Sequence, residues 1–211
     1  MANIVLGVTG SVAAIYTAEL TGQLQLEGHA VKIVATQPAT YFFDYNNPKL
    51  TVIQEQDEWP GFAEGKKYQR GDSVVHIELR RWGELLLMAP IDANTIAKLA
   101  NGLADNCLTC VYRAWERTRP IILAPAMNTL MWEHPATARH LRQIAFDAGL
   151  ATVPATTDLP ELMAWINAQC PLLQIVPPQQ KKLACEDVGV GAMASLEDIV
   201  QFVKKSVVSS Q

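Results

Sequence analysis

Short apolar runs alternate with helix-like stretches along this chain. The apolar runs lie at residues 2–8, 30–35, 84–89, 120–125 and 172–176. Helical patterns extend from Ser11 to Gly28 and cover 93–104, 106–116, 135–148, 159–168 and 196–208. Short buried strands that alternate with helices are typical of a parallel sheet covered on both faces. We therefore predict a flavodoxin/Rossmann-like α/β fold with three layers, α/β/α.

Two segments depart from this alternation. Residues 54–73 are polar and contain glycines, which predicts a surface excursion. Residues 177–193 hold two prolines and two glycines and show no clear period. Long irregular stretches in compact domains are usually either disordered or functional. Cys185 lies in the middle of the second segment and favours a functional interpretation.

Length and composition fit a globular protein without a membrane span. The 211 residues are enough for one domain, 1–211, with a sizeable core, and 49% of them are hydrophobic and 18% charged. No apolar run approaches the roughly 18 residues that span a bilayer, and the beginning has no basic region of a signal peptide. The net charge of −4 disfavours a nucleic-acid partner. We expect a cytoplasmic protein.

The four cysteines do not follow the spacing of a secreted disulfide framework. They are Cys107, Cys110, Cys170 and Cys185. Cys107 and Cys110 form a C-x-x-C, a motif of redox and zinc sites, but no second metal pair accompanies it and its segment has a helical pattern. We interpret both as buried thiols, as is usual for free cysteine, and expect no metal site.

Short polar or glycine-rich turns follow two of the predicted strands. The first turn, Gly10-Ser11, lacks the G-x-G-x-x-G dinucleotide fingerprint, yet it suits a mononucleotide phosphate. A plain turn in which Ser11 caps a helix is equally compatible. Asp92, Asn94 and Thr95 follow the third strand and allow the same two interpretations, a ligand-binding edge or a helix cap.

Two further residues carry candidate chemistry. Asn128 follows the fourth strand within PAMNTLMW, and its amide can contact a carboxylate or another amide. His76 lies in an alternating segment, residues 74–79, that favours a strand, where a lone histidine is normally structural. The remaining histidines have loop or helix contexts, and we interpret them as structural.

Six motifs together resemble one protein family. They are GVTGSVAA, HIELRRW, APIDANT, GLADNCLTCVYRAW, PAMNTLMWEHP and LACEDVGVGAMA. In this order, from about residue 2 to 205, they closely resemble the homo-oligomeric flavin-containing cysteine decarboxylases. Within that family the chain is most similar to the stand-alone branch that converts 4'-phosphopantothenoylcysteine into 4'-phosphopantetheine for coenzyme A synthesis.

The resemblance implies roles for individual residues. His76 matches the active-site histidine, Asn128 the asparagine that grips the substrate carboxylate, and Cys185 a proton donor on a flexible flap. FMN-contacting positions fall on Gly10, Ser11, Thr36, Ala39, Phe42, Asp92, Ala93, Asn94, Thr95 and Ala126. Lys182, Ala184 and Met193 match positions where the flap closes over the substrate.

The chemistry that the resemblance implies accounts for these residue types. Loss of CO₂ from a cysteinyl carboxylate would leave a carbanion without an electron sink. In the family, FMN oxidises the cysteinyl group to a thioaldehyde, and decarboxylation then gives an enethiol that is reduced with Cys185 as proton donor. An imidazole such as that of His76 suits proton transfer near neutral pH.

The family also predicts assembly, since its FMN lies between subunits and His76 and Asn128 would approach it from different chains. We expect a trimer or a trimer-based dodecamer. Three departures from the family pattern stand out: Glu186 replaces the usual glycine after Cys185, Asp92 replaces a frequent serine, and residues 154–171 are an extra stretch. We predict that this stretch forms an added surface helix at a subunit contact.

Three other functions fit the sequence less well. Peptide cysteine decarboxylases of the lantibiotic type do not use the reducing flap cysteine. Non-catalytic FMN-binding phosphatase regulators typically lose a catalytic residue or carry long acidic tails, whereas His76, Asn128 and Cys185 occur together here. Flavin prenyltransferases share the broad fold but lack the PAMNTLMW segment and the flap cysteine.

Overall fold

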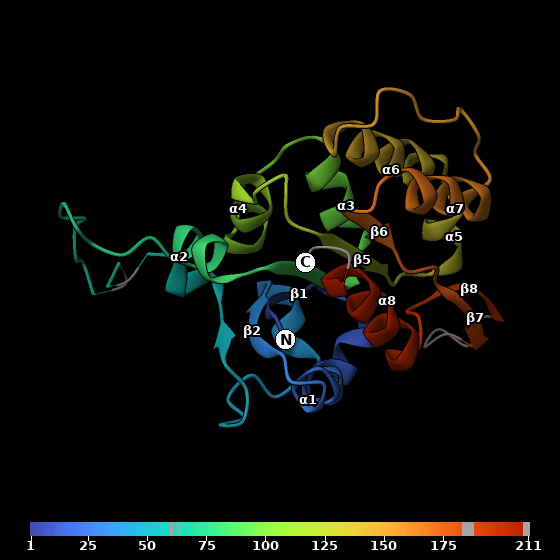
Figure 1. Ribbon diagram of the computed structural model, residues 1–211. Coiled ribbons are helices and arrows are strands. Elements are labelled where there is room, and N and C mark those ends of the chain that lie inside the picture. The colour runs from blue at the N-terminus through green and yellow to red at the C-terminus, as the bar shows by residue number, and fades with distance from the viewer. Residues whose placement is uncertain (60, 63, 183–187, 209–211) are drawn as a thin grey trace.

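A parallel sheet of six strands forms the centre of the molecule (Figure 1). The computed structural model describes residues 1–59, 61–62, 64–182 and 188–208. The strands are β1 (Asn3–Val8), β2 (Ala30–Ala35), β3 (Val52–Ile53), β4 (Leu85–Ile91), β5 (Ile121–Pro125) and β6 (Leu173–Ile175), in the spatial order β3-β2-β1-β4-β5-β6. From β1 to β3 successive strands are added toward one edge of the sheet, and from β4 to β6 toward the other. In doubly wound folds, ligands bind at this switch point between β1 and β4. The predicted fold class is confirmed.

Helices cover both faces of the sheet. One face carries α1 (Thr17–Leu26) and α8 (Leu196–Val208), which contribute Leu20 and Ile199 to one hydrophobic cluster. The other face carries α2 (Val75–Trp82), α3 (Ala93–Ala100), α4 (Cys107–Ala114), α6 (Pro135–Asp147) and α7 (Leu159–Gln169). Three short 3₁₀ helices, η1 (Val12–Tyr16), η2 (Gln37–Tyr41) and η3 (Glu55–Glu58), complete the connections together with the four-residue α5 (Thr129–Trp132).

Strand β4, at the centre of the sheet, is apolar at every position because both of its faces are covered. Leu85 and Leu87 pack into the cluster beneath α1 and α8, while Leu86 and Met88 pack into the cluster beneath α2, α3 and α4. Side chains of a strand alternate between faces, and here each face is covered by helices. All seven residues of β4 are therefore buried, as expected for a parallel sheet.

Two local predictions are wrong. The segment around His76 is the helix α2, not a strand, because Val75, Leu79 and Trp82 fall on one helical face that packs on the core. The segment 177–193, predicted to be irregular, contains the antiparallel pair β7 (Gln179–Lys182) and β8 (Val188–Ala192). Gly189 and Gly191 have no side chains to bury, so the sequence of this segment lacks the alternation of apolar and polar residues that indicates a strand.

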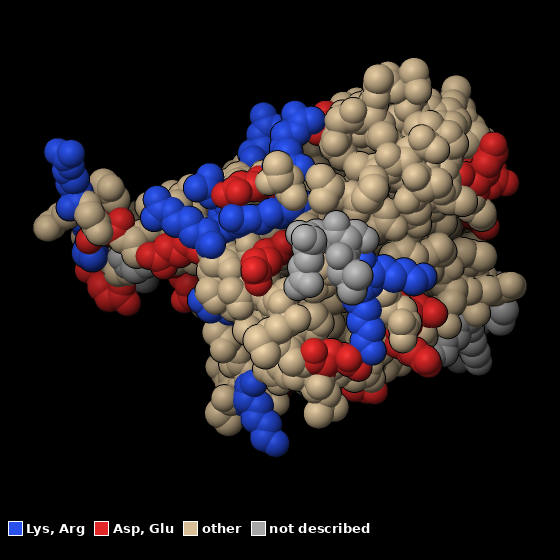
Figure 2. Space-filling view, viewed as in Figure 1, with Lys and Arg blue, Asp and Glu red and all other residues tan. Residues whose placement is uncertain are grey.

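The stretch at 154–171 forms the helix α7, as predicted, but this helix is no mere surface addition. Leu162 and Ile166 are fully buried and join the larger hydrophobic cluster beside β6. No helix among the described residues has the length and apolarity to cross a membrane. Figure 2 shows charges of both signs side by side around α2, while the side formed by α6 and α7 is largely uncharged.

Candidate active site

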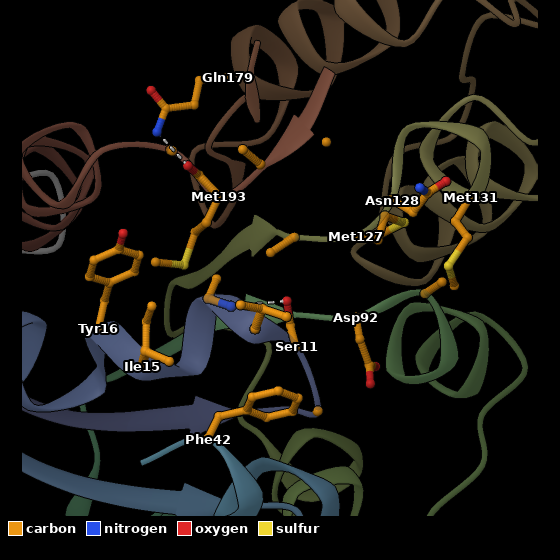
Figure 3. Close-up of a pocket in the computed structure, with 18 of the residues that line it drawn as sticks. Ser11, Ile15, Tyr16, Phe42, Asp92, Met127, Asn128, Met131, Gln179 and Met193 are labelled. Atoms are coloured by element: carbon orange, nitrogen blue, oxygen red, sulfur yellow. Dashed lines mark hydrogen bonds between the residues drawn. The ribbon is translucent and has the colours of Figure 1, made fainter. Parts of the chain in front are cut away.

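A cavity of about 800 Å³ opens at the carboxyl ends of the central strands. Its walls come from the turns after β1, β4 and β5, from η1, from β8 and from the beginning of α8 (Figure 3). This volume lies within the range of roughly 300–1,000 Å³ that is usual for small-molecule sites. The cavity thus lies at the switch point of the sheet, where the fold places ligands.

Most of the residues predicted to contact ligand line this cavity. They are Gly10, Ser11, Phe42, Asp92, Ala93, Asn94, Ala126, Asn128 and Met193. Three predicted residues, Thr36, Ala39 and Thr95, are buried and do not line it. Thr36 Oγ1 instead donates to the carbonyl of Val8 at 3.4 Å, so it supports the wall from behind.

The turn after β1 is built around the small size of Gly10. A Cβ atom at Gly10 would lie 2.7 Å from Cβ of Pro38, so only glycine allows η2 to approach this closely. Ser11 follows as the N-cap of η1, and its Oγ accepts from the N–H of Ala13 at 3.4 Å. The turn therefore brings backbone and hydroxyl groups to the cavity wall.

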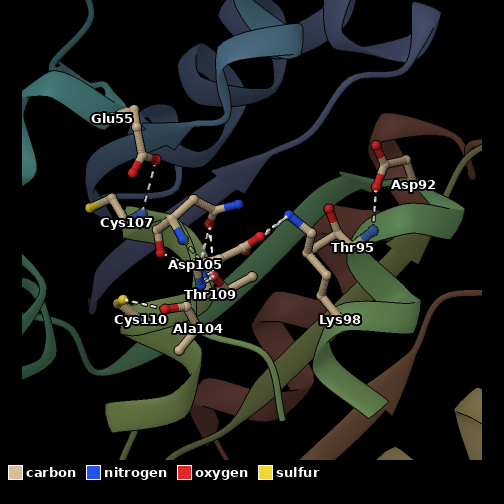
Figure 4. Close-up of polar contacts among 10 residues, drawn as sticks. Glu55, Asp92, Thr95, Lys98, Ala104, Asp105, Cys107, Thr109 and Cys110 are labelled. Atoms are coloured by element: carbon tan, nitrogen blue, oxygen red, sulfur yellow. Dashed lines mark hydrogen bonds and ion pairs between the residues drawn. The ribbon is translucent and has the colours of Figure 1, made fainter. Parts of the chain in front are cut away.

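Thr9 joins this turn to the one after β4. Its buried hydroxyl donates to the carbonyl of Pro90 at 3.1 Å and accepts from the N–H of Asp92 at 2.8 Å. Asp92 is in turn the N-cap of α3, since its Oδ1 accepts from the N–H of Thr95 at 2.7 Å (Figure 4). Asp92 thus caps α3 and also lines the cavity. The cap is confirmed, and the role of Asp92 in ligand binding stays a prediction.

The opposite wall carries Asn128. Its Oδ1 accepts from the N–H of Leu130 at 2.9 Å, which fixes the orientation of the amide. Strand β8 is attached beside it, because the N–H of Met127 donates to the carbonyl of Gly191 at 2.9 Å. Gly191 has φ +142°, and a Cβ there would lie 2.5 Å from the carbonyl oxygen of Met127.

His76 does not line this cavity. It lies on α2, beside α4, whereas Asn128 precedes α5 at the other end of the sheet (Figure 1). Nδ1 of His76 is in hydrogen-bonding contact with Oε1 of Glu58. One chain therefore does not bring together the two residues that the family resemblance assigns to a single active site.

The C-x-x-C motif lies next to this histidine. Cys107 is buried and Cys110 is partly exposed, and burial is the main cause that raises the pKa of both thiols. The N–H of Cys107 donates to Glu55 at 3.1 Å (Figure 4). Donor atoms of Glu58, His76 and Cys110 lie within 4.8 Å of one another, a geometry that a metal ion could use. The sequence analysis named His76 and the C-x-x-C separately but did not predict this cluster, because Glu58 lies in the polar segment 54–73.

Several predicted residues lie where the structure gives no side chain. Ala184 and Cys185, together with Glu186, fall outside the described residues. Lys182 belongs to β7 by its backbone, and its side chain is not described. The roles of Lys182, Ala184 and Cys185 remain predictions.

The sequence analysis missed part of the cavity wall. Ile15 and Tyr16 of η1, Met127 and Met131 around α5, and Gln179 of β7 all line it. The side chains of Ile15, Tyr16 and Met131 remain 40–51% exposed. Apolar residues of this size at the start of a helical segment, next to a glycine turn, are the signal that could have indicated them.

Comparisons with known proteins identify the family of this chain. The sequence model of the Flavoprotein family matches residues 1–208. Phosphopantothenoylcysteine decarboxylases of Mus musculus and Arabidopsis thaliana are each 40% identical over 204 residues, 96% of this chain and 85% and 83% of theirs.

Two solved structures superimpose over the whole chain. A mutant PPC decarboxylase in complex with pantothenoylaminoethenethiol has a TM-score of 0.77 at 34% identity and covers 100% of this chain and 99% of its own. The FMN-binding protein AtHal3 has a TM-score of 0.76 at 37% identity, with 100% and 98% covered. By sequence and by fold, this chain belongs to the Flavoprotein family.

Proposed function

We propose that this chain is an FMN-dependent decarboxylase that converts 4'-phosphopantothenoylcysteine into 4'-phosphopantetheine. The observation that carries the proposal is the 40% sequence identity to two phosphopantothenoylcysteine decarboxylases over 96% of the chain. The cavity at the switch point of the sheet supports it, because its lining residues coincide with most of the positions expected from the family. The ligand of one structural neighbour, an aminoethenethiol, corresponds to a cysteinyl group that has been oxidised by two electrons and has lost CO₂.

The cavity residues fit a flavin mononucleotide. Gly10 and Ser11 offer a tight turn with a hydroxyl and backbone N–H groups, which suits a phosphate. Phe42, Ile15 and Met193 supply apolar surface of the kind that an aromatic ring system requires. When bound, FMN would supply the two-electron oxidation and reduction that amino-acid side chains cannot perform.

Asn128 is suited to hold the substrate carboxylate. Because its Oδ1 accepts from Leu130 N–H, the –NH₂ end of the amide is the part that can donate to an anionic oxygen. Met127, Met131 and Gln179 surround this position in the cavity wall. Asn128 would thus orient the carboxylate that leaves as CO₂.

His76 would reach such a site only from a second chain. Since α2 contributes nothing to the cavity of its own chain, we assign the complete site to the boundary between subunits of a trimer. The half-exposed Ile15, Tyr16 and Met131 at the cavity support this assembly, because apolar side chains of this size favour a protein interface.

Mixed assemblies test this arrangement directly. His76→Asn and Asn128→Asp chains, each inactive alone, are unfolded and refolded together in equal amounts with FMN. In random cyclic trimers about a quarter of the sites then combine an intact His76 from one chain with an intact Asn128 from the next. CO₂ release at about a quarter of the wild-type rate supports the shared site, and no recovery contradicts it.

The substrate and the role of Cys185 are tested by separating the two half-reactions. We expect Cys185→Ser to release CO₂ but to accumulate the enethiol, because the proton donor for its reduction is missing. His76→Asn should release no CO₂. Mass spectrometry of the products after anaerobic mixing distinguishes the two variants. If the wild type releases no CO₂ from phosphopantothenoylcysteine, or if Cys185→Ser forms 4'-phosphopantetheine normally, the respective assignment is wrong.

A further inference from the structure

A carboxylate is buried beneath the histidine on α2. Glu58 is the last residue of η3 and is only 2% exposed, while the His76 side chain is 20% exposed. Glutamate is almost never buried unless it is paired, and Oε1 of Glu58 contacts Nδ1 of His76. Its other oxygen, Oε2, is buried without a hydrogen-bond partner among the described residues.

The segment that carries Glu58 is fixed on two sides. At its beginning, the N–H of Gln54 donates to Asp57 at 2.7 Å, which closes the turn. Glu55, the first residue of η3, accepts from the N–H of Cys107 at 3.1 Å. This hydrogen bond attaches η3 to the N-terminus of α4. Glu58 is therefore held against α2 by local structure that does not depend on the histidine.

The chemistry of the two side chains assigns the direction of the hydrogen bond between Glu58 and His76. Burial raises the pKa of the Cys107 thiol, and the neighbouring Glu58 raises it further, so this thiol stays protonated. A carboxylate can only accept hydrogen bonds, so the shared hydrogen atom must come from the imidazole. A proton on Nδ1 leaves Nε2 as the basic nitrogen of a neutral ring.

We propose that Glu58 is a positioning residue that keeps a proton on Nδ1 of His76 and thereby leaves Nε2 as the atom that exchanges protons with the substrate. This proposal rests on the proposed function of His76. The carboxylate fixes both the tautomer and the rotation of the ring, as the third member of a catalytic triad does for its histidine.

Nitrogen NMR of the FMN-loaded, full-length protein tests the tautomer without any turnover. The protein is labelled with ¹⁵N-histidine, measured at mildly alkaline pH, and the His76 signals are assigned by their loss in His76→Gln. We expect a protonated Nδ1 in the wild type and a shift toward protonated Nε2 in Glu58→Met, which keeps the chain length but removes the acceptor. An unprotonated Nδ1 in the wild type, or no change in Glu58→Met, overturns the proposal.

Kinetics of the nearly isosteric Glu58→Gln test the consequence. With FMN content and melting temperature retained, kcat for CO₂ release should fall on the order of tenfold to a hundredfold, part of the ~10²–10⁴ that a general base contributes, with KM little changed. Glu55→Gln is the matched control, because it alters the same 3₁₀ helix without touching His76. It should lower the melting temperature and keep kcat within about twofold.

The outcomes separate this proposal from the proposed function. If the wild type fails to decarboxylate phosphopantothenoylcysteine, the substrate assignment fails, while the NMR result still decides whether Glu58 sets the tautomer. If Glu58→Gln retains the wild-type kcat, the positioning role fails and the substrate stands. A stoichiometric zinc ion in the purified protein, bound through Glu58, His76 and Cys110, would also overturn the proposal, because the metal would replace the shared proton.

Discussion

Gly191 connects strand β8 to the cavity wall and offers a sharp test of the site. Its carbonyl accepts from the N–H of Met127 at 2.9 Å, and its φ of +142° lies in a region that favours glycine. An added Cβ would lie 2.5 Å from the carbonyl oxygen of Met127. Gly191→Ala should therefore separate β8 from the turn that carries Asn128.

The size of the effect follows from the backbone. A non-glycine residue in such a conformation costs on the order of 1–3 kcal/mol, before the contact with Met127 is counted. About 2 kcal/mol corresponds to a factor of roughly 30 in an equilibrium constant. Because this cost falls on one hairpin, we expect it to weaken the closed cavity more than the global fold.

Ligand affinity and stability are measured separately to show this. Apoprotein is titrated with FMN by fluorescence, CO₂ release gives kcat/KM, and calorimetry gives the melting temperature. The control is Gly65→Ala, which has φ +78° and no described atom within 4 Å of its added Cβ. If Gly191→Ala and Gly65→Ala reduce kcat/KM equally, β8 does not form a functional wall and the reasoning is wrong.

Three further predictions use other contacts. Thr9→Val should cost about 1–3 kcal/mol and weaken FMN binding, because the N–H of Asp92 loses its buried acceptor; denaturant unfolding and FMN titration measure both. Gly22→Ala should raise the melting temperature by about 1–4 °C, because Gly22 lies inside α1 with open space around it; unchanged melting would contradict this. Burial lowers the pKa of His29, so the unfolded chain binds a proton that the folded chain does not. Stability should therefore fall as the pH drops below about 6.5, and less so in His29→Gln.

The layers of the fold could be predicted because they depend on local periodicity. β4 is apolar at every position since helices cover both of its faces, and this pattern is visible in the sequence. The segment around His76 misled the prediction, because its apolar residues satisfy both an alternating pattern and the helical spacing of Val75, Leu79 and Trp82. The packing of this segment against the rest of the protein decides between strand and helix, and a pattern of six residues does not reveal that packing.

The candidate site was predictable to the extent that it depends on strand ends. Gly10, Asp92 and Asn128 each follow a strand of one parallel sheet, so the topology alone brings them to one edge. Glu58 could not be found in this way. It contacts His76 across 18 positions of polar sequence, and only the docking of η3 against α2 and α4 creates the pair.

The burial of Glu58 favours a functional role for this residue over a role in stabilising the fold. Removing a carboxylate from water is costly, and a well-packed apolar residue at such a place is often neutral or stabilising. Glu58 keeps one oxygen without a hydrogen-bond partner among the described residues, so its contact with His76 does not fully offset that cost. A residue selected for stability would satisfy both oxygens or be apolar. Glu58→Met should consequently retain or raise the melting temperature while CO₂ release falls, and a large loss of stability would instead indicate a structural pair.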